Sequence, residues 1–368
     1  MNDNLLRAKT TTLISTGKLT PKRQANSDLN MEEMMSGIAL PNSKPRRLVF
    51  ELTNSCNLNC IMCGRNAAEF KPTFFKYEWF DFFAPIMSEI EEVTLMGWGE
   101  PTIHPDFVKM LETLHKLGVR KYFCTNGMRL DKLTPAIFEN EVEVFAVSLD
   151  GANAQINEII RRGCDFDKIV SSLKEIVKIK KSKNLSYPYI NFVFTAMKRN
   201  LHEIPAMVRL AAEIGIQEVK VVYLTAFDDV LAEQILYDSM DEVAAVFDEA
   251  EKVAKELGIF LKLPHICGND PANDKCHKDC YTLWRDFFLG SDGYVRSCMS
   301  SPEKLFAIDK YGSFDEAWHS QEIAQLRAKI NSDEMPNSCK RCYQSSHANW
   351  NNKSSFDQRE NVFSPKWE

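Results

Sequence analysis

No apolar run in this 368-residue sequence approaches the ~18 residues of a membrane-spanning helix, and the polar N-terminus has no secretory apolar core. These two absences predict a cytoplasmic protein without a membrane partner. The sequence also lacks an excess of basic residues, since 45 Lys and Arg against 51 Asp and Glu leave a net charge of −6. Because a negatively charged protein repels a polyanion, we do not expect a nucleic acid as its main partner.

Cysteines are sparse in the middle of the chain. The eleven cysteines form one group from Cys56 to Cys63 and another from Cys267 to Cys342, with Cys124 and Cys164 between them. A reducing cytoplasm disfavours disulfides, whereas clustered cysteines are typical metal ligands. The distribution therefore predicts two metal centres, one encoded near each end of the chain.

The first group, Cys56, Cys60 and Cys63, has C-x3-C-x2-C spacing and directly follows the apolar run 48–53, which predicts a strand. Three thiolates supply three of the four ligands that a structural zinc ion or a closed [4Fe–4S] cluster needs. A catalytic metal centre keeps an open coordination position for its substrate. The spacing thus favours a catalytic centre, with a zinc knuckle or buried thiols as the alternatives.

Strands and amphipathic helices alternate between Arg47 and Ile266. We expect six strands, at 48–53, 92–96, 121–124, 144–149, 189–195 and 218–224, and helices that end at Gly118, Gly215 and Gly258. Repeated strand–helix units imply parallel strands with right-handed crossovers, and hence a closed or partial barrel. In such barrels the chemistry lies at the C-terminal ends of the strands.

Three of these strand ends carry further motifs. The second strand leads into Gly-Trp-Gly-Glu-Pro at 97–101, the third into Thr-Asn-Gly at 125–127, and the fourth into Ser-Leu-Asp-Gly at 148–151. Together with the cysteine spacing, these motifs resemble the radical S-adenosylmethionine (SAM) superfamily. The resemblance implies an α/β fold with a partial (β/α)6 TIM-like barrel. It also implies a [4Fe–4S] cluster on the first three cysteines, whose fourth iron holds SAM.

The same resemblance implies SAM contacts for seven residues: Met62, Gly97, Gly99, Glu100, Asn126, Ser148 and Arg161. The Gly-x-Gly-Glu segment would bind the SAM amino group, and Ser148 would meet the ribose or the carboxylate. Arg161 would pair with the carboxylate, which suits a planar and permanently charged group, and Arg162 is the alternative. Met62 stands where the family often has an aromatic residue against the adenine.

The C-terminal group contains a second ligand set, Cys280, Cys298, Cys339 and Cys342. Ser-Asp-Gly at 291–293 predicts a hairpin between 287–289 and 294–296, which would bring Cys280 near Cys298. The order resembles the shortened SPASM, or twitch, extension, which holds one auxiliary [4Fe–4S] cluster. No cysteine follows Cys342, so a second auxiliary cluster is not expected. Structural zinc is the alternative for these four thiolates.

Cys267 and Cys276 remain, in a polar stretch that leaves the barrel near its mouth. They are either ordinary thiols or, by resemblance to radical SAM epimerases, donors of a hydrogen atom to a substrate radical. The predicted domains are an N-terminal arm at 1–46, the radical SAM barrel at 47–266, the auxiliary cluster domain at 267–345 and a tail at 346–368.

The resemblance implies an enzyme that reductively cleaves SAM to a 5′-deoxyadenosyl radical and abstracts hydrogen from a substrate. A fully ligated auxiliary cluster cannot bind substrate, so it would move an electron, which favours oxidation of a carbinol on a sugar or cyclitol-type small molecule. A radical epimerase of a sugar or peptide, a peptide-modifying maturase and a non-catalytic zinc- or cluster-binding scaffold are the alternatives. The arm is too short for the winged-helix domain that often precedes peptide-modifying members, which lowers the expectation of a peptide. A flavodoxin- or ferredoxin-type electron donor is expected.

Overall fold

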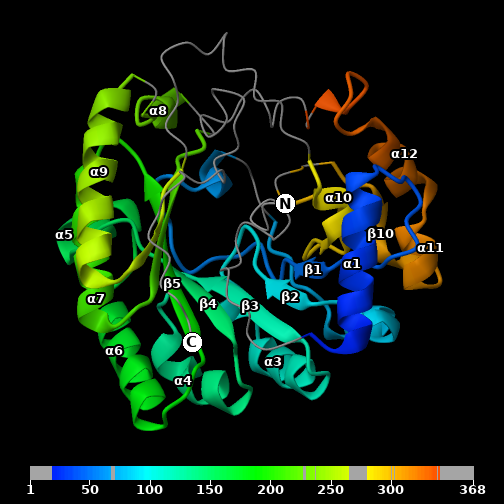
Figure 1. Cartoon of the computed structure of the whole chain (residues 1–368), viewed down its shortest axis with the longest axis horizontal. Coiled ribbons are helices and arrows are strands. Elements are labelled where there is room, and N and C mark those ends of the chain that lie inside the picture. Colours follow the sequence, from blue (N-terminus) through cyan, green and yellow to red (C-terminus); the bar gives the residue numbers. More distant parts are fainter. Residues whose placement is uncertain are drawn as a thin grey trace.

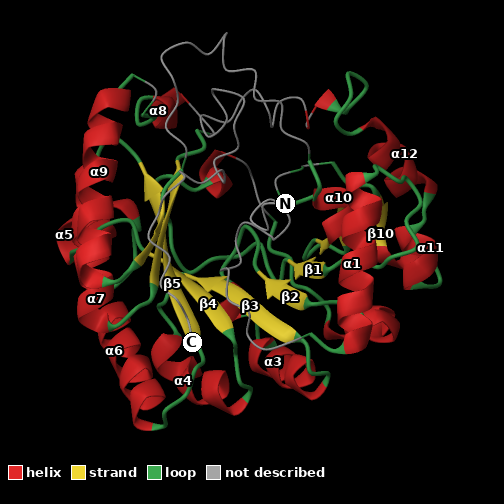
Figure 2. Ribbon diagram, viewed as in Figure 1, coloured by secondary structure: helices red, strands yellow, loops and turns green. Residues whose placement is uncertain are grey.

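The computed structural model describes residues 19–67, 71–226, 229–236, 238–264, 280–299, 301, 303–337 and 339. Strands and helices alternate along most of this part of the chain, and Figure 1 shows the strands gathered inside a ring of helices. The sheet curves, and helices α3 to α7 and α9 lie on its outer side (Figure 2). No helix among the described residues is both long enough and apolar enough to cross a membrane.

Ten strands form one sheet in the order β10-β9-β8-β1-β2-β3-β4-β5-β6-β7. They are β1 (Arg47–Phe50), β2 (Glu92–Leu95), β3 (Arg120–Thr125), β4 (Val144–Ser148), β5 (Tyr189–Ala196), β6 (Glu218–Tyr223), β7 (Phe260–Lys262), β8 (Asp286–Leu289), β9 (Tyr294–Arg296) and β10 (Phe306–Ala307). Strands β8 and β1 to β7 pair in parallel, and β9 and β10 continue the sheet in antiparallel pairing. The described strands do not close into a ring, so the predicted α/β fold with a partial barrel is confirmed.

The helices are α1 (Pro21–Met35), α2 (Phe80–Phe83), α3 (Phe107–Lys116), α4 (Leu130–Glu139), α5 (Ala154–Ile160), α6 (Phe166–Ser182), α7 (Ile204–Ile214), α8 (Asp229–Ala232), α9 (Met240–Leu257), α10 (Thr282–Arg285), α11 (Phe314–Trp318) and α12 (Gln321–Lys329). The side chains of Asn153 and Asp165 cap the first turns of α5 and α6. The predicted stops Gly118, Gly215 and Gly258 follow α3, α7 and α9 with φ of +61°, +94° and +68°. These left-handed positions favour glycine, which explains why the helices end there.

The six predicted strands correspond to β1 to β6, with the largest boundary difference at the end of β1. Strand β7 was not predicted; it has three residues and ends at Lys262, which pairs with Glu218 of β6 (3.0 Å). The predicted hairpin is present as β8 and β9, but β8 also pairs in parallel with β1. The main sheet therefore runs across the boundary that we expected between residues 266 and 267.

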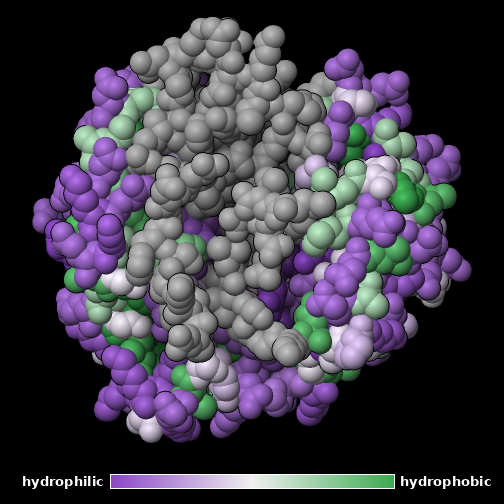
Figure 3. All heavy atoms as spheres, in the orientation of Figure 1, coloured by the Kyte–Doolittle hydropathy of each residue, from purple (hydrophilic) through white to green (hydrophobic). Residues whose placement is uncertain are grey.

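The two faces of the sheet differ in chemistry. In β5, Ile190, Phe192 and Phe194 belong to the large apolar core beneath the helices, whereas Tyr189 and Val193 belong to a small cluster on the inner face. Figure 3 shows that the solvent-facing sides of the outer helices are largely hydrophilic. Helices bury one apolar face against the sheet in this arrangement, which leaves the inner face available for a ligand.

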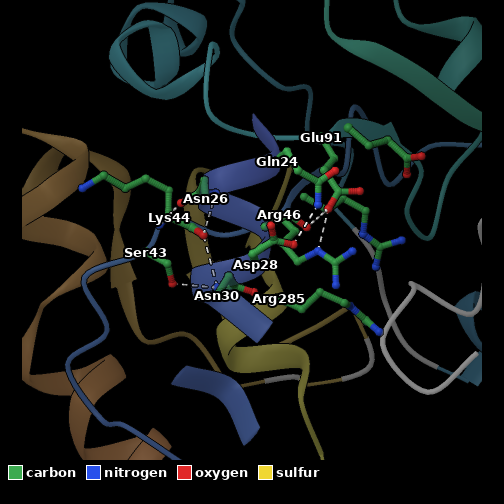
Figure 4. Close-up of polar contacts among 12 residues, drawn as sticks. Gln24, Asn26, Asp28, Asn30, Ser43, Lys44, Arg46, Glu91 and Arg285 are labelled. Atoms are coloured by element: carbon green, nitrogen blue, oxygen red, sulfur yellow. Dashed lines mark hydrogen bonds and ion pairs between the residues drawn. The ribbon is translucent and has the colours of Figure 1, made fainter. Parts of the chain in front are cut away.

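Helix α1 attaches the N-terminal arm to the C-terminal part of the chain. Asn30 is fully buried, and its amide donates to Ser43 Oγ (3.0 Å) and to the carbonyls of Lys44 (3.2 Å) and Trp284 (2.9 Å). Figure 4 shows Asn30 reaching from α1 toward Ser43. Met34 on the same helix packs with Trp284 in a small apolar cluster. Within the arm predicted at 1–46, the helix begins at Pro21 behind the capping residue Thr20.

Candidate active site at the C-terminal ends of the strands

The loop that follows β1 carries Cys56, Cys60 and Cys63. Cys60 is buried, and the other two thiols are half-buried. The loop backbone is fixed by the end of α5, because the N–H of Asn59 donates to Arg162 O (3.0 Å) and the N–H of Ile61 donates to Ile160 O (2.9 Å). The cysteine loop is therefore held at two places: it continues from the end of β1, and its backbone is hydrogen-bonded to the end of α5.

The Gly-Trp-Gly-Glu-Pro segment after β2 lies directly against the same loop. The N–H of Gly99 donates to Thr53 O (3.1 Å), and the N–H of Glu100 donates to Ser55 O (2.9 Å). A Cβ atom on Gly99 would lie 2.2 Å from Ser55 O, a backbone atom that cannot move aside cheaply. Close approach of two backbones thus requires glycine here, which is the reason for the motif.

Glu100 orients the neighbouring turn with a buried carboxylate. One of its oxygens, Oε1, accepts from the Thr125 hydroxyl (2.7 Å) and the Thr102 hydroxyl (2.6 Å), and Oε2 accepts from the N–H of Asn126 (2.7 Å). Burial raises the pKa of Glu100, and these hydrogen bonds oppose that effect. The sequence analysis assigned Glu100 to SAM, and in this structure its side chain fixes the Thr-Asn-Gly turn.

Asn126 extends that turn toward the cysteine loop. Its amide nitrogen donates to Asn57 Oδ1 (2.9 Å) and lies 3.9 Å from Cys56 Sγ. Its Oδ1 accepts from the N–H of Met128 (3.0 Å), which fixes the orientation of the amide. The structure therefore brings Asn126 next to the first cysteine, as expected if both belong to one site.

Arg161 follows α5 and is buried beside Cys60. Its Nε lies 2.7 Å from Asp150 Oδ2 in an ion pair, and the N–H of Thr195 donates to Asp150 Oδ1 (2.7 Å). Although burial opposes the charged form, the Asp150 carboxylate raises the pKa of Arg161, so the guanidinium stays charged. Asp150 received no role in the sequence analysis, and its place in Ser-Leu-Asp-Gly was the available signal. A guanidinium has five donors, so one carboxylate partner does not exhaust it.

Ser148 and Met62 have different surroundings. Ser148 Oγ is 3.5 Å from Cys124 Sγ on the inner face of the sheet, and both residues are half-buried. Met62 packs against a small apolar cluster that includes Ile160, Met197 and Leu224. An apolar wall next to the cysteine loop suits an adenine ring, which is the contact predicted for Met62.

The donor set fits an iron–sulfur cluster. Within the described ranges no three His, Cys, Asp or Glu side chains converge as ligands of a single ion do. In a [4Fe–4S] cluster each thiolate binds a different iron, which matches three thiols spread along one loop. Burial raises the pKa of the Cys60 thiol to about 11, so cluster binding has to release its proton.

The C-terminal cysteines are partly within the described residues. Cys280 and Cys339 pack against the same small apolar cluster, formed by Met34, Leu283, Trp284, Leu326 and Ile330. The structure therefore brings together two thiols that are far apart in the sequence, and Cys298 follows β9. Cys342 and the proposed hydrogen donors Cys267 and Cys276 lie outside the described residues.

Comparison with family models supports both sites. Residues 50–211 match the radical SAM superfamily, and residues 280–343 match the SPASM iron–sulfur cluster-binding domain. The two matches thus define a protein with a SAM-binding domain and an iron–sulfur cluster-binding domain. The chain carries a radical SAM domain followed by a SPASM domain, and the cofactors of these two domains are SAM and two [4Fe–4S] clusters, as the resemblance implied.

Two curated relatives show moderate similarity. A tungsten-containing aldehyde ferredoxin oxidoreductase cofactor-modifying protein from Pyrococcus furiosus is 27% identical over 230 residues, or 60% of this chain and 62% of that protein. Mycofactocin maturase MftC from Mycolicibacterium smegmatis is 28% identical over 178 residues, or 46% of this chain and 43% of that protein. The chain thus matches less than two thirds of the length of either relative.

A solved structure extends the likeness of fold. SuiB from Streptococcus suis bound to SAM matches 92% of this chain and 81% of its own chain, with a TM-score of 0.63 at 13% identity. SuiB bound to its precursor peptide SuiA matches 96% of this chain and 83% of its own, again with a TM-score of 0.63 and 13% identity. The shared architecture therefore includes most of both chains.

Proposed function

We propose that this chain is a peptide-modifying radical SAM enzyme, whose substrate enters the barrel from the C-terminal ends of the strands. When bound, SAM and the first cluster supply a 5′-deoxyadenosyl radical that takes a hydrogen atom from the substrate. The chain supports this reaction with the cysteine loop, the Gly99 backbone approach and Arg161 held by Asp150. A flavodoxin- or ferredoxin-type protein would provide the electron.

The observation that carries the substrate position is Asn191 on the inner face. Asn191 is fully buried in β5, and neither atom of its amide has a hydrogen-bond partner among the residues that the structure describes. Two residues further along β5, Val193 pairs in register with Ser148 of β4. Both residues are half-buried, so this part of the interior, nearer the C-terminal ends of the strands, is open. An unpaired buried polar group costs roughly 1–3 kcal/mol, and a ligand would remove that cost. The Asn191 amide offers an N–H donor and a carbonyl acceptor, which match the carbonyl and the N–H of a peptide bond in a substrate. This match favours a peptide substrate.

The relatives support the same substrate class. One is a maturase, and SuiB was solved with a precursor peptide over a fold that matches 96% of this chain. These likenesses outweigh the expectation from the short arm, because SuiB matches nearly the whole chain at the level of fold. The preference for a sugar or cyclitol substrate therefore moves to second place.

Oxidation of a carbinol on a small molecule is the second candidate. It is favoured by Cys280, Cys298, Cys339 and Cys342, which would hold an auxiliary cluster that accepts an electron. Epimerisation with Cys267 or Cys276 as the hydrogen donor is the redox-neutral variant. These reactions differ in their products, so one experiment separates them.

The reconstituted enzyme would be incubated anaerobically with SAM, a reductant and either a precursor peptide encoded near its gene or a panel of sugars, in deuterated water. We expect a peptide product that has lost two hydrogens, of which one is carried by 5′-deoxyadenosine and the other leaves as a proton while its electron passes to the auxiliary cluster. A new carbonyl on a small molecule would overturn the peptide proposal in favour of the dehydrogenase, and deuterium at an inverted carbon would indicate the epimerase. Asn191→Leu should abolish the peptide product and leave the slow formation of 5′-deoxyadenosine without substrate unchanged.

A further inference from the structure

The carboxylate of Glu51 joins three segments that are distant in the sequence. Glu51 is the first residue after β1 and is 6% exposed. Its Oε1 accepts from the N–H of Trp98 (2.9 Å), and its Oε2 accepts from the N–H (3.1 Å) and the hydroxyl (2.8 Å) of Ser291. All three partners are neutral donors, and both oxygens of the carboxylate accept hydrogen bonds, which come from two different loops.

One of these loops belongs to the predicted SAM contact. Trp98 lies between Gly97 and Gly99, and a Cβ atom on Gly97 would lie 2.3 Å from Glu51 Cγ. The Glu51 side chain therefore packs directly under the segment as well as accepting its hydrogen bond. A shift of this segment when SAM binds has to move Glu51 too.

The other loop belongs to the hairpin between two auxiliary cysteines. Ser291 lies in the turn between β8 and β9, and this hairpin connects the segments that hold Cys280 and Cys298. The backbone N–H of Glu51 also donates to Leu289 O (3.0 Å) at the end of β8. Glu51 thus binds the hairpin through its backbone N–H, at the end of β8, and through its carboxylate, in the turn that follows.

We propose that Glu51 is a positioning residue that couples SAM binding to the auxiliary-cluster hairpin. Its two oxygens are held by the two loops, so ordering of the Gly97–Gly99 segment by SAM stabilises the Ser291 turn. Coupling between two sites is reciprocal, and loosening the turn must weaken SAM binding by the same factor. The inference rests on the family assignment and is independent of the substrate, so loss of the peptide proposal would leave it intact.

Three variants of the reconstituted enzyme test this coupling. Glu51→Gln keeps the shape but offers one acceptor oxygen in place of two, so one loop loses its partner. Ser291→Ala removes the hydroxyl bond to Glu51, together with the bond between the Ser291 and Thr73 hydroxyls (2.7 Å), and leaves the side chains of Glu51 and Trp98 in place. The matched control, Arg47→Met, removes the ion pair with Asp286 (2.7 Å) at the other end of the same β1–β8 pair. Affinity for SAM is measured by anaerobic calorimetry, and amide hydrogen exchange is measured for residues 290–293.

In the unaltered enzyme we expect SAM to slow hydrogen exchange in the Ser291 turn. Glu51→Gln should raise the dissociation constant for SAM about tenfold. Ser291→Ala should raise it several-fold and reduce the protection of the turn, whereas Arg47→Met should leave the SAM affinity unchanged. Unchanged exchange on SAM addition, unchanged affinity in Ser291→Ala, or equal weakening by Arg47→Met would each overturn the proposal. If Glu51→Gln fails to fold, the SAM affinities of Ser291→Ala and Arg47→Met are compared with each other, and that comparison by itself tests the coupling.

Discussion

Arg161 and Asp150 form a buried ion pair, with 2.7 Å between Nε and Oδ2, next to the cysteine loop. Asp150 also accepts from the backbone of Thr195, so the guanidinium is anchored to β5 through its partner. Arg161 is the residue predicted to bind the SAM carboxylate. Its orientation therefore depends on a residue that need not contact SAM.

We predict that Asp150→Asn weakens SAM binding about tenfold, because the variant removes the charge of the buried ion pair that holds the Arg161 guanidinium in place. The measurement is anaerobic calorimetry with SAM on the reconstituted protein. Asp238→Asn is the control, since Asp238 makes an exposed ion pair with Lys198. Equal SAM affinity in both variants would contradict the anchoring role.

Substitution of Gly99 tests the close approach of two backbones. A Cβ atom at Gly99 would lie 2.2 Å from Ser55 O and 2.3 Å from Thr53 O, so Gly99→Ala has to displace the cysteine loop. We expect loss of SAM binding and of the iron held by Cys56, Cys60 and Cys63, measured as bound SAM and as iron content. Gly312→Ala is the matched control, because its Cβ would meet the end of the Glu316 side chain at 3.4 Å. Full iron retention in Gly99→Ala would show that the loop adapts.

The strands and helix ends could be predicted because their signals are local. Apolar periodicity located β1 to β6, and glycines at left-handed positions marked the ends of α3, α7 and α9. The parallel pairing of β8 with β1 could not be predicted from a hairpin turn signal, because a turn fixes its own two strands and says nothing of a third.

The site was predictable in part for the same reason. Spacing identified Cys56, Cys60 and Cys63 because their ligand pattern lies within eight residues. The role of Glu51 depends on partners that only the fold brings close to it. The role of Asn191 depends on the lack of partners among the described residues, which also follows from the fold. Glu51 meets Ser291 across 240 residues, and no local pattern encodes that contact.

The attachment of α1 provides a test of stability. The amide nitrogen of Asn30 donates to three acceptors, two of them in buried contacts, and the bond to the Trp284 carbonyl joins α1 to α10. Asn30→Ala leaves the Ser43 hydroxyl and two carbonyls without this donor, and we expect the free energy of unfolding to fall by about 1–3 kcal/mol. Urea unfolding under anaerobic conditions measures the change. Gln24→Ala on the exposed side of α1 should change it by less than about 0.5 kcal/mol, and equal losses would contradict the account.

The formation of 5′-deoxyadenosine from SAM tests the central claim most directly. The reconstituted and reduced enzyme should release 5′-deoxyadenosine, and Cys56→Ala should abolish this release while the iron of the auxiliary site stays bound, at about half of the unaltered content. Continued release of 5′-deoxyadenosine by Cys56→Ala, or loss of all iron from it, would contradict a separate SAM-binding cluster on the loop after β1.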